Sequence, residues 1–160
     1  MSNPKYRVLT SDELALLEKE FVDFLVINGI TADDWVKIKE QDQETSASMV
    51  TAFSDVIMEG ALRKTFYLEK IDKHRIASIH FQSEQMVLSA MEAPLGSIAD
   101  FTDQEFIKKA TAEAPSYLKT YTTSENYPKS REESIYYFTT LGWLVSDGKL
   151  YKALALASTK

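Results

Sequence analysis

Apolar residues in the first third of the chain recur at helical spacing. Thr10 and Glu13 have the spacing of a capping box, in which each side chain satisfies a free backbone amide of the first turn. The first predicted helix therefore covers residues 11–28. Its apolar positions extend well beyond one face: they are Leu14, Leu16, Leu17, Phe21, Val22, Phe24, Leu25, Val26 and Ile27. A helix with so wide an apolar surface is buried on two sides or meets a partner.

Two more helices are predicted in this region. Thr31 is suited to cap the second one, and Asp33 and Asp34 lie in its first turn, where acids complement the helix dipole. Residues 49–60 form the third helix, because their apolar positions again recur at helical spacing. The polar segment 42–48 before them is a short connection or the exposed start of this helix. The helical region as a whole is expected over residues 10–62.

The apolar period then changes from 3.6 to 2, which predicts three antiparallel strands over 65–71, 74–82 and 85–93. Tight turns at 72–73 and 83–84 bring eight apolar residues to one face of this meander. The expected pairs are Phe66 with Ile79, Leu68 with Ala77, Phe81 with Met86, Ile79 with Leu88, and Ala77 with Ala90. A shift of one residue would move each side chain to the other face.

The other face of the meander is mixed. Three of its residues, Ile76, Val87 and Met91, are apolar and need cover from another element of the chain or from another subunit. They are therefore the candidate interface residues.

The remaining segment, 102–157, is expected to form a helix, a loop, a second helix and a terminal hairpin. The helices cover about 103–112 and 131–141, and the loop between them is polar and rich in tyrosine. The hairpin turns at Ser146–Lys149. A helix that starts near Asp147 is the competing interpretation, because the alanines and leucines that follow favour helices. The sequence thus predicts an α+β fold in a single domain over residues 1–160.

Composition narrows the possible functions. The chain has 160 residues, and its 18 Lys and Arg against 24 Asp and Glu give a formal net charge of −6. A nucleic-acid partner is therefore not expected, since phosphate contacts require a cationic surface. Cysteine is absent, which excludes disulfides and thiolate metal ligands. His74 and His80 would lie roughly 20 Å apart along one strand, too far to share a metal ion.

Membrane association is not expected either. No apolar run reaches the roughly 18 residues that a spanning helix needs. The first six residues lack the apolar stretch of a signal peptide. We therefore expect a soluble, cytoplasmic protein.

Signatures of catalysis are missing from the sequence. It contains neither the G-x-S-x-G motif nor a glycine-rich phosphate loop. Neighbouring carboxylates such as Glu132 and Glu133 lie near predicted helix starts, where capping and the helix dipole explain them. No catalytic residue, metal ligand or cofactor is assigned, and a non-enzymatic protein is favoured.

Tyrosine is enriched in the last third of the chain, which holds six of the eight tyrosines. Tyrosine rings give a large contact area with a polar tip and are common in binding surfaces. The predicted loop over 115–130 carries Tyr117, Tyr121 and Tyr127, which are therefore the candidate binding residues.

Much of the chain resembles a family of small uncharacterised bacterial proteins, a domain of unknown function. The resemblance rests on Tyr6-Arg7-Val8-Leu9-Thr10, Glu20-Phe21, Phe24-Leu25, Asn28-Gly29-Ile30, Asp34-Trp35, Phe53-Ser54-Asp55, Glu59, Tyr67-Leu68-Glu69, Gly142 and Ser146-Asp147-Gly148-Lys149-Leu150-Tyr151. It implies no activity, cofactor or catalytic residue. The helix over 131–141 and the turn at Gly148 also resemble a winged-helix unit.

Three hypotheses follow for the function. The preferred one is a non-enzymatic protein-interaction module that self-associates or binds a protein partner. The second is a small-molecule or peptide binder, with or without enzymatic activity, whose pocket lies between the sheet and the tyrosine-rich loop. The third is a winged-helix-like regulator.

Overall fold

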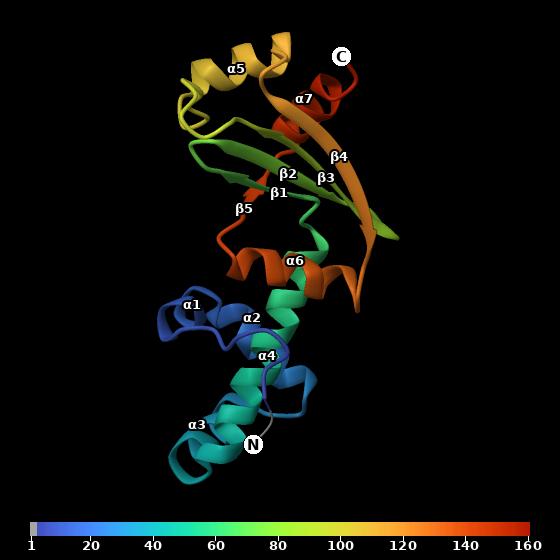
Figure 1. Ribbon diagram of the computed structural model, residues 1–160. Coiled ribbons are helices and arrows are strands. Elements are labelled where there is room, and N and C mark those ends of the chain that lie inside the picture. Colours follow the sequence, from blue (N-terminus) through green and yellow to red (C-terminus); the bar gives the residue numbers. More distant parts are fainter. Residues whose placement is uncertain (1–2) are drawn as a thin grey trace. The chain divides into compact units, whose positions relative to one another are not determined.

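The computed structural model describes residues 3–160 and has an α+β fold, as predicted (Figure 1). The described residues form seven helices: α1 Ser11–Leu16, α2 Glu18–Ile27, α3 Ala32–Gln41, α4 Gln43–Arg63, α5 Gln104–Glu113, α6 Arg131–Thr140 and α7 Lys149–Ala157. They also form five strands: β1 Tyr67–Ile71, β2 Arg75–Phe81, β3 Gln85–Glu92, β4 Lys119–Asn126 and β5 Leu144–Ser146. The chain divides into two compact units, one ending at Ala61 and the other comprising Leu62–Lys160. The single-domain organisation stays a prediction.

The N-terminal unit is helical. The capping box is confirmed, because Thr10 accepts a hydrogen bond from the Glu13 amide and the Glu13 carboxylate accepts one from the Thr10 amide. The single helix predicted over 11–28 is two helices, since Leu17 has a non-helical backbone at φ −110° and ψ 23°. Four aromatic rings pack together inside this unit, with centroids 4.9 to 6.5 Å apart: Phe21, Phe24, Trp35 and Phe53.

Helix α4 begins at Gln43, so the interpretation of the polar segment before Met49 as the exposed start of this helix is confirmed. The Asp42 carboxylate accepts hydrogen bonds from the Thr45 amide at 3.1 Å and the Thr45 hydroxyl at 2.7 Å. An aspartate in this position caps a helix start. The polar first turn therefore belongs to the helix although it buries little.

The C-terminal unit is built on an antiparallel sheet with the order β4-β3-β2-β1-β5. The predicted pairing of β2 with β3 is confirmed, with Phe81 opposite Met86 and Ile79 opposite Leu88. The pairing of β1 with β2 differs from the prediction by two residues, because Leu68 lies opposite Ile79. The turn causes this shift: the Asp72 amide donates to the Arg75 carbonyl at 2.8 Å, so the hairpin turns one residue later than expected.

Helices α5 and α7 cover one face of this sheet, and α6 lies on the other side (Figure 1). The core under α5 and α7 contains Ile76, Met91, Phe101, Ala110 and Leu154, each at most 1% exposed. The cover that Ile76 and Met91 need therefore comes from the chain itself.

Two predictions for the C-terminal third are corrected. The tyrosine-rich segment is not a loop, because residues 119–126 form β4 and pair with β3 along their whole length. The terminal hairpin is replaced by the short strand β5, which pairs with β1, and by α7. The competing helical interpretation is thus the correct one. Gly148 adopts the left-handed conformation at φ 89° before α7, and the Asp147 carboxylate accepts a hydrogen bond from the Lys149 amide.

Candidate functional site

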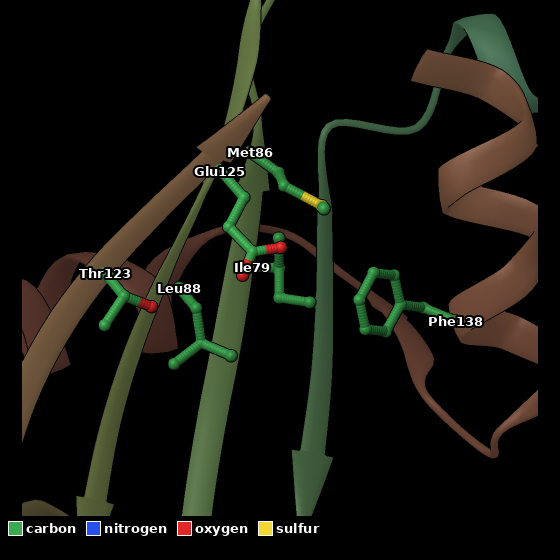
Figure 2. A pocket seen from close by; sticks show the side chains of 6 residues that line it. All are labelled: Ile79, Met86, Leu88, Thr123, Glu125 and Phe138. Carbon is green, nitrogen blue, oxygen red and sulfur yellow. The ribbon is translucent and has the colours of Figure 1, made fainter. Parts of the chain in front are cut away.

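A pocket of about 160 Å³ opens on the α6 side of the sheet (Figure 2). The residues that line it are Ile79, Met86, Leu88, Thr123, Glu125 and Phe138. Strands β2, β3 and β4 supply the first five, and α6 supplies Phe138. The strand register explains why they meet: Ile79, Leu88 and Thr123 lie opposite one another across three strands, and Met86 lies opposite Glu125.

The wall formed by Phe138 is held firmly in place. Its ring lies 6.1 Å from the ring of Phe81 and 5.5 Å from the ring of Trp143. Phe81 and Trp143 are both buried. Aromatic rings at these separations and tilts attract one another beyond the effect of area burial. The pocket therefore has a preformed apolar wall, Phe138, in addition to its polar residues Thr123 and Glu125.

The volume of the pocket restricts the size of the ligand that can enter it. Pockets that hold drug-sized ligands or cofactors usually measure about 300–1,000 Å³. A pocket of about 160 Å³ is too small for these ligands and has room for a single long side chain or a small organic ion.

Glu125 supplies the charge of the pocket. Among the residues that the structure describes, its carboxylate has neither an ion-pair partner nor a hydrogen-bond partner. Figure 2 shows this carboxylate directed over the apolar floor. An unpaired anion next to apolar side chains is suited to a cation with an apolar stem, such as the side chain of lysine or arginine.

Strand β4 adds a second feature to the site. It is at the end of the sheet order, so only one of its sides is paired. Alternate residues of such an edge strand direct their N–H and C=O groups away from the sheet. Two pocket residues, Thr123 and Glu125, belong to this strand. The pocket is therefore adjacent to an edge that can accept another strand.

The three candidate binding tyrosines do not converge on one ligand site. Tyr117 precedes β4 and is 43% exposed. Tyr127 follows β4, and its hydroxyl donates to the carbonyl oxygens of Gln82 and Gln85 at 2.5 and 3.1 Å. It thus fixes the turn between β2 and β3, and burial raises its pKa.

Tyr121 belongs to a hydrogen-bonded network on the same sheet face as the pocket. Its hydroxyl donates to Glu92 at 2.7 Å and accepts from Arg75 at 3.0 Å, while Arg75 pairs with Glu92 at 3.0 Å. Burial, followed by the hydrogen bond to Glu92, raises the pKa of Tyr121. The hydrogen bond from Tyr121 lowers the pKa of Glu92. The network closes on itself and fixes β2, β3 and β4 relative to one another.

The candidate interface residues lie on the opposite face, under α5 and α7. Ile76 and Met91 are completely buried within the chain, and Val87 is half-buried. Ile76 and Met91 have no surface to offer a partner, so we do not propose them as interface residues.

The two histidines lie in different surroundings within the C-terminal unit. The ring of His80 stacks on Tyr67 with centroids 4.5 Å apart and meets the edge of Tyr151 at 5.3 Å. His74 lies in the turn before β2, and its Nδ1 is buried without a hydrogen-bond partner. In the described part of the chain, no group of three or more His, Cys, Asp or Glu residues could hold a metal ion. Within residues 3–160, no helix is long and apolar enough to cross a membrane.

Sequence reasoning missed half of the pocket. It placed Ile79, Met86 and Leu88 on one face of the meander, but it assigned no binding role to Thr123, Glu125 or Phe138. The run from Thr120 to Thr123 consists of residues that favour strands, and it was the available signal for β4. No pattern in the sequence indicates that α6 brings Phe138 to this face.

The fold and the pocket define a small α+β protein with a side-chain-sized pocket beside an open sheet edge. The chain belongs to a family of unknown function, DUF6495, whose family model matches residues 1–159. This finding confirms the resemblance to an uncharacterised family. No curated protein and no solved structure matches the chain.

Proposed function

We propose that this protein is an interaction module that binds an extended, basic peptide segment of another protein. The segment adds to the free edge of β4 and inserts one lysine or arginine side chain into the pocket. The observation that carries the proposal is the unpaired carboxylate of Glu125 in a pocket of about 160 Å³ beside an unpaired strand edge. This function combines the interaction module and the peptide binder that the sequence suggests.

The spacing of strands supports a long side chain as the occupant. An added strand would lie about 4.8 Å beyond β4 and therefore about 10 Å from β3. The apolar floor residues Met86 and Leu88 belong to β3. Only a long side chain bridges this distance, and the stems of lysine and arginine are apolar while their ends are charged.

Strand addition supplies affinity that does not depend on the peptide sequence, because main-chain groups of β4 and of the peptide form hydrogen bonds. Side chains of the peptide alternate between the two sheet faces, so every second residue faces the pocket side. The pocket then selects which residue occupies the matching position. Recognition therefore needs one basic residue in an extended context.

The test uses nine-residue peptides of alternating threonine and valine with a central lysine, studied by calorimetry and by NMR of the amide groups. We expect the lysine peptide to shift the β4 amides. Replacing lysine by norleucine, which keeps the stem and removes the charge, should weaken binding about fivefold, as should Glu125→Gln. Glu125 is exposed, and an ion pair with an exposed carboxylate is worth about 1 kcal/mol. Glu105→Gln on α5 is the matched control and should leave binding unchanged, since Glu105 is highly exposed and α5 lies on the face of the sheet opposite the pocket.

Two results would contradict the proposal. Unchanged β4 amides, or full binding by a peptide whose alternate amides are N-methylated, would show that no strand is added. If n-butylammonium binds as tightly as the lysine peptide, the pocket is a site for small cations and the peptide is not the ligand.

A further inference from the structure

The N-terminal unit carries a second surface, formed by α1 and α2, whose properties differ from those of the pocket. Four large aliphatic residues there are exposed to solvent: Leu16 85%, Val22 43%, Val26 62% and Ile27 84%. Three of them, Val22, Val26 and Ile27, lie within two turns of one helix, and contiguous exposed apolar residues on soluble proteins often mark interaction sites. We propose that this surface binds an amphipathic, basic helix of a partner protein.

The exposed residues of α2 are arranged in two neighbouring rows. Val22 and Val26 are one turn apart, so their side chains share a face of the helix. Glu20, Asp23 and Ile27 form the adjacent row, with spacings of three and four residues. Lys19, which is also exposed, lies one turn before Val22 and Asp23, so this helical surface combines aliphatic residues with two acidic residues and one basic residue. The inward side of the same helix carries Phe21, Phe24 and Leu25.

Charge identifies the kind of partner. Residues 1–61 contain five Lys and Arg against twelve Asp and Glu, a formal charge of −7, whereas residues 62–160 have a formal charge of +1. The negative charge of the whole chain thus comes from the unit that bears the exposed aliphatic surface. A basic partner is attracted to this unit, and like-charged partners are repelled.

The same charge argues against two other occupants. A second copy of the chain would bring another unit of −7 against the first. An anionic membrane surface would repel the unit for the same reason. A helix carrying lysine or arginine between aliphatic residues matches both the acidic and the apolar positions of this surface.

A helix fits this surface better than an extended strand does. All contacts with a helical surface must be made through side chains, because the backbone groups in the middle of α2 already bond to one another. Apolar anchors one turn apart, such as Val22 and Val26, are the usual contact points for a helix that packs lengthwise on another.

The probe is an 18-residue amphipathic peptide of leucine and lysine, compared with a matched peptide of leucine and glutamate, with affinities measured by calorimetry. We expect the lysine peptide to bind and the glutamate peptide not to bind. The double variant Val22→Ser/Val26→Ser should weaken binding at least tenfold. Val56→Ser on α4, where Val56 is 56% exposed, is the matched control in the same unit and should retain wild-type affinity.

Reversing single charges distinguishes attraction of the peptide to the α1–α2 surface from attraction to the net charge of the whole unit. Asp23→Lys should weaken the lysine peptide several-fold, whereas Glu40→Lys on α3 changes the net charge equally and should have a smaller effect. Circular dichroism checks that each variant keeps its helices, since all of these residues are exposed. Equal loss in both charge variants, or full affinity of the double variant, would overturn the proposal.

The solution mass decides between a partner and a second copy. Light scattering of the protein alone should show a monomer at all concentrations. A dimer that Val22→Ser/Val26→Ser dissociates would mean that another copy occupies this surface, and the basic-helix proposal would be wrong. Glu125→Gln should leave binding of the helical peptide unchanged, because the two proposals concern different units.

Discussion

At the scale of single residues, His80 is the group that we expect to make stability depend on pH near neutrality. Its ring packs against the rings of Tyr67 and Tyr151, which also contact each other, so the three rings form one cluster. Burial, together with the positive charges of Arg131 and Lys152, lowers the pKa of His80 from its ordinary value of 6.5. The folded state therefore favours the neutral imidazole, and the unfolded chain binds more protons in the window just below pH 6.5.

The resulting prediction is that the free energy of unfolding falls as the pH drops from about 7.5 to about 5.5, because the contribution of neutral His80 is complete above pH 6.5 and is lost below it. His80→Phe keeps the stacked rings and removes the titration, so this slope should largely disappear. Urea unfolding at both pH values measures the free energy of unfolding and therefore its slope with pH. Glu13, whose pKa the Arg7 guanidinium lowers to about 2, titrates well below this window. An unchanged slope in His80→Phe would show that another group is responsible.

At the scale of secondary-structure elements, Arg131 connects α6 to the ends of α4 and β2 and to the segment between α4 and β1. Its guanidinium donates to the carbonyl oxygens of Phe81 at 3.2 Å and Leu62 at 3.3 Å, and also to that of Thr65. The side chain is only 13% exposed. The helix that carries the pocket residue Phe138 is thus fixed at its first residue.

Arg131→Met should destabilise the protein by about 1–3 kcal/mol, because carbonyl oxygens lose charged donors in a region that little water reaches. It should also weaken binding at the pocket, since the wall formed by Phe138 would lose its support. Lys129→Met, an exposed neighbour, serves as the control for the lost charge and should change stability by less than about 0.5 kcal/mol. Denaturant unfolding gives both values, and equal effects in the two variants would contradict the role of Arg131.

The elements also show what sequence patterns can predict. The pairing of β2 with β3 was predictable because two alternating strands and a short turn leave one register that buries Phe81, Ile79 and Ala77 together. The shift of β1 by two residues could not be predicted, because a pattern of period 2 looks the same after such a shift. Strand β4 escaped detection because an edge strand exposed on both faces has no apolar alternation.

At the scale of the whole molecule, the pocket and the α1–α2 surface lie in different units and differ in kind. The first is a side-chain-sized pocket on a sheet, and the second is a broad acidic and aliphatic helical surface. The sequence indicated the second one, because the apolar width of the segment over 11–28 was visible in its spacing. The pocket depends on three segments that meet only in the folded chain, which is why three of its residues could not be predicted.

Helix α4 indicates that the two units unfold cooperatively. This helix runs across the boundary after Ala61, and its last turn is built into the C-terminal unit, where Leu62 is buried and its carbonyl accepts from Arg131. Helix formation is cooperative along the chain, so unfolding of one end destabilises the other. A unit of about 60 residues is also marginally stable by itself. Single-domain behaviour, as proposed from the sequence, is therefore expected.

The two tryptophans allow a direct test, since Trp35 lies in the N-terminal unit and Trp143 in the C-terminal unit. Trp35→Phe leaves Trp143 as the fluorescence probe of the C-terminal unit. Trp143→Phe leaves Trp35 as the probe of the N-terminal unit. Within each variant, the urea midpoint from fluorescence should coincide with the midpoint from far-UV circular dichroism, because one transition unfolds the whole chain. Comparing two probes within one variant removes the effect of the substitution on stability. If fluorescence of Trp35 changes at lower urea than the circular dichroism does, the N-terminal unit unfolds separately, and the α1–α2 surface belongs to an independent binding domain.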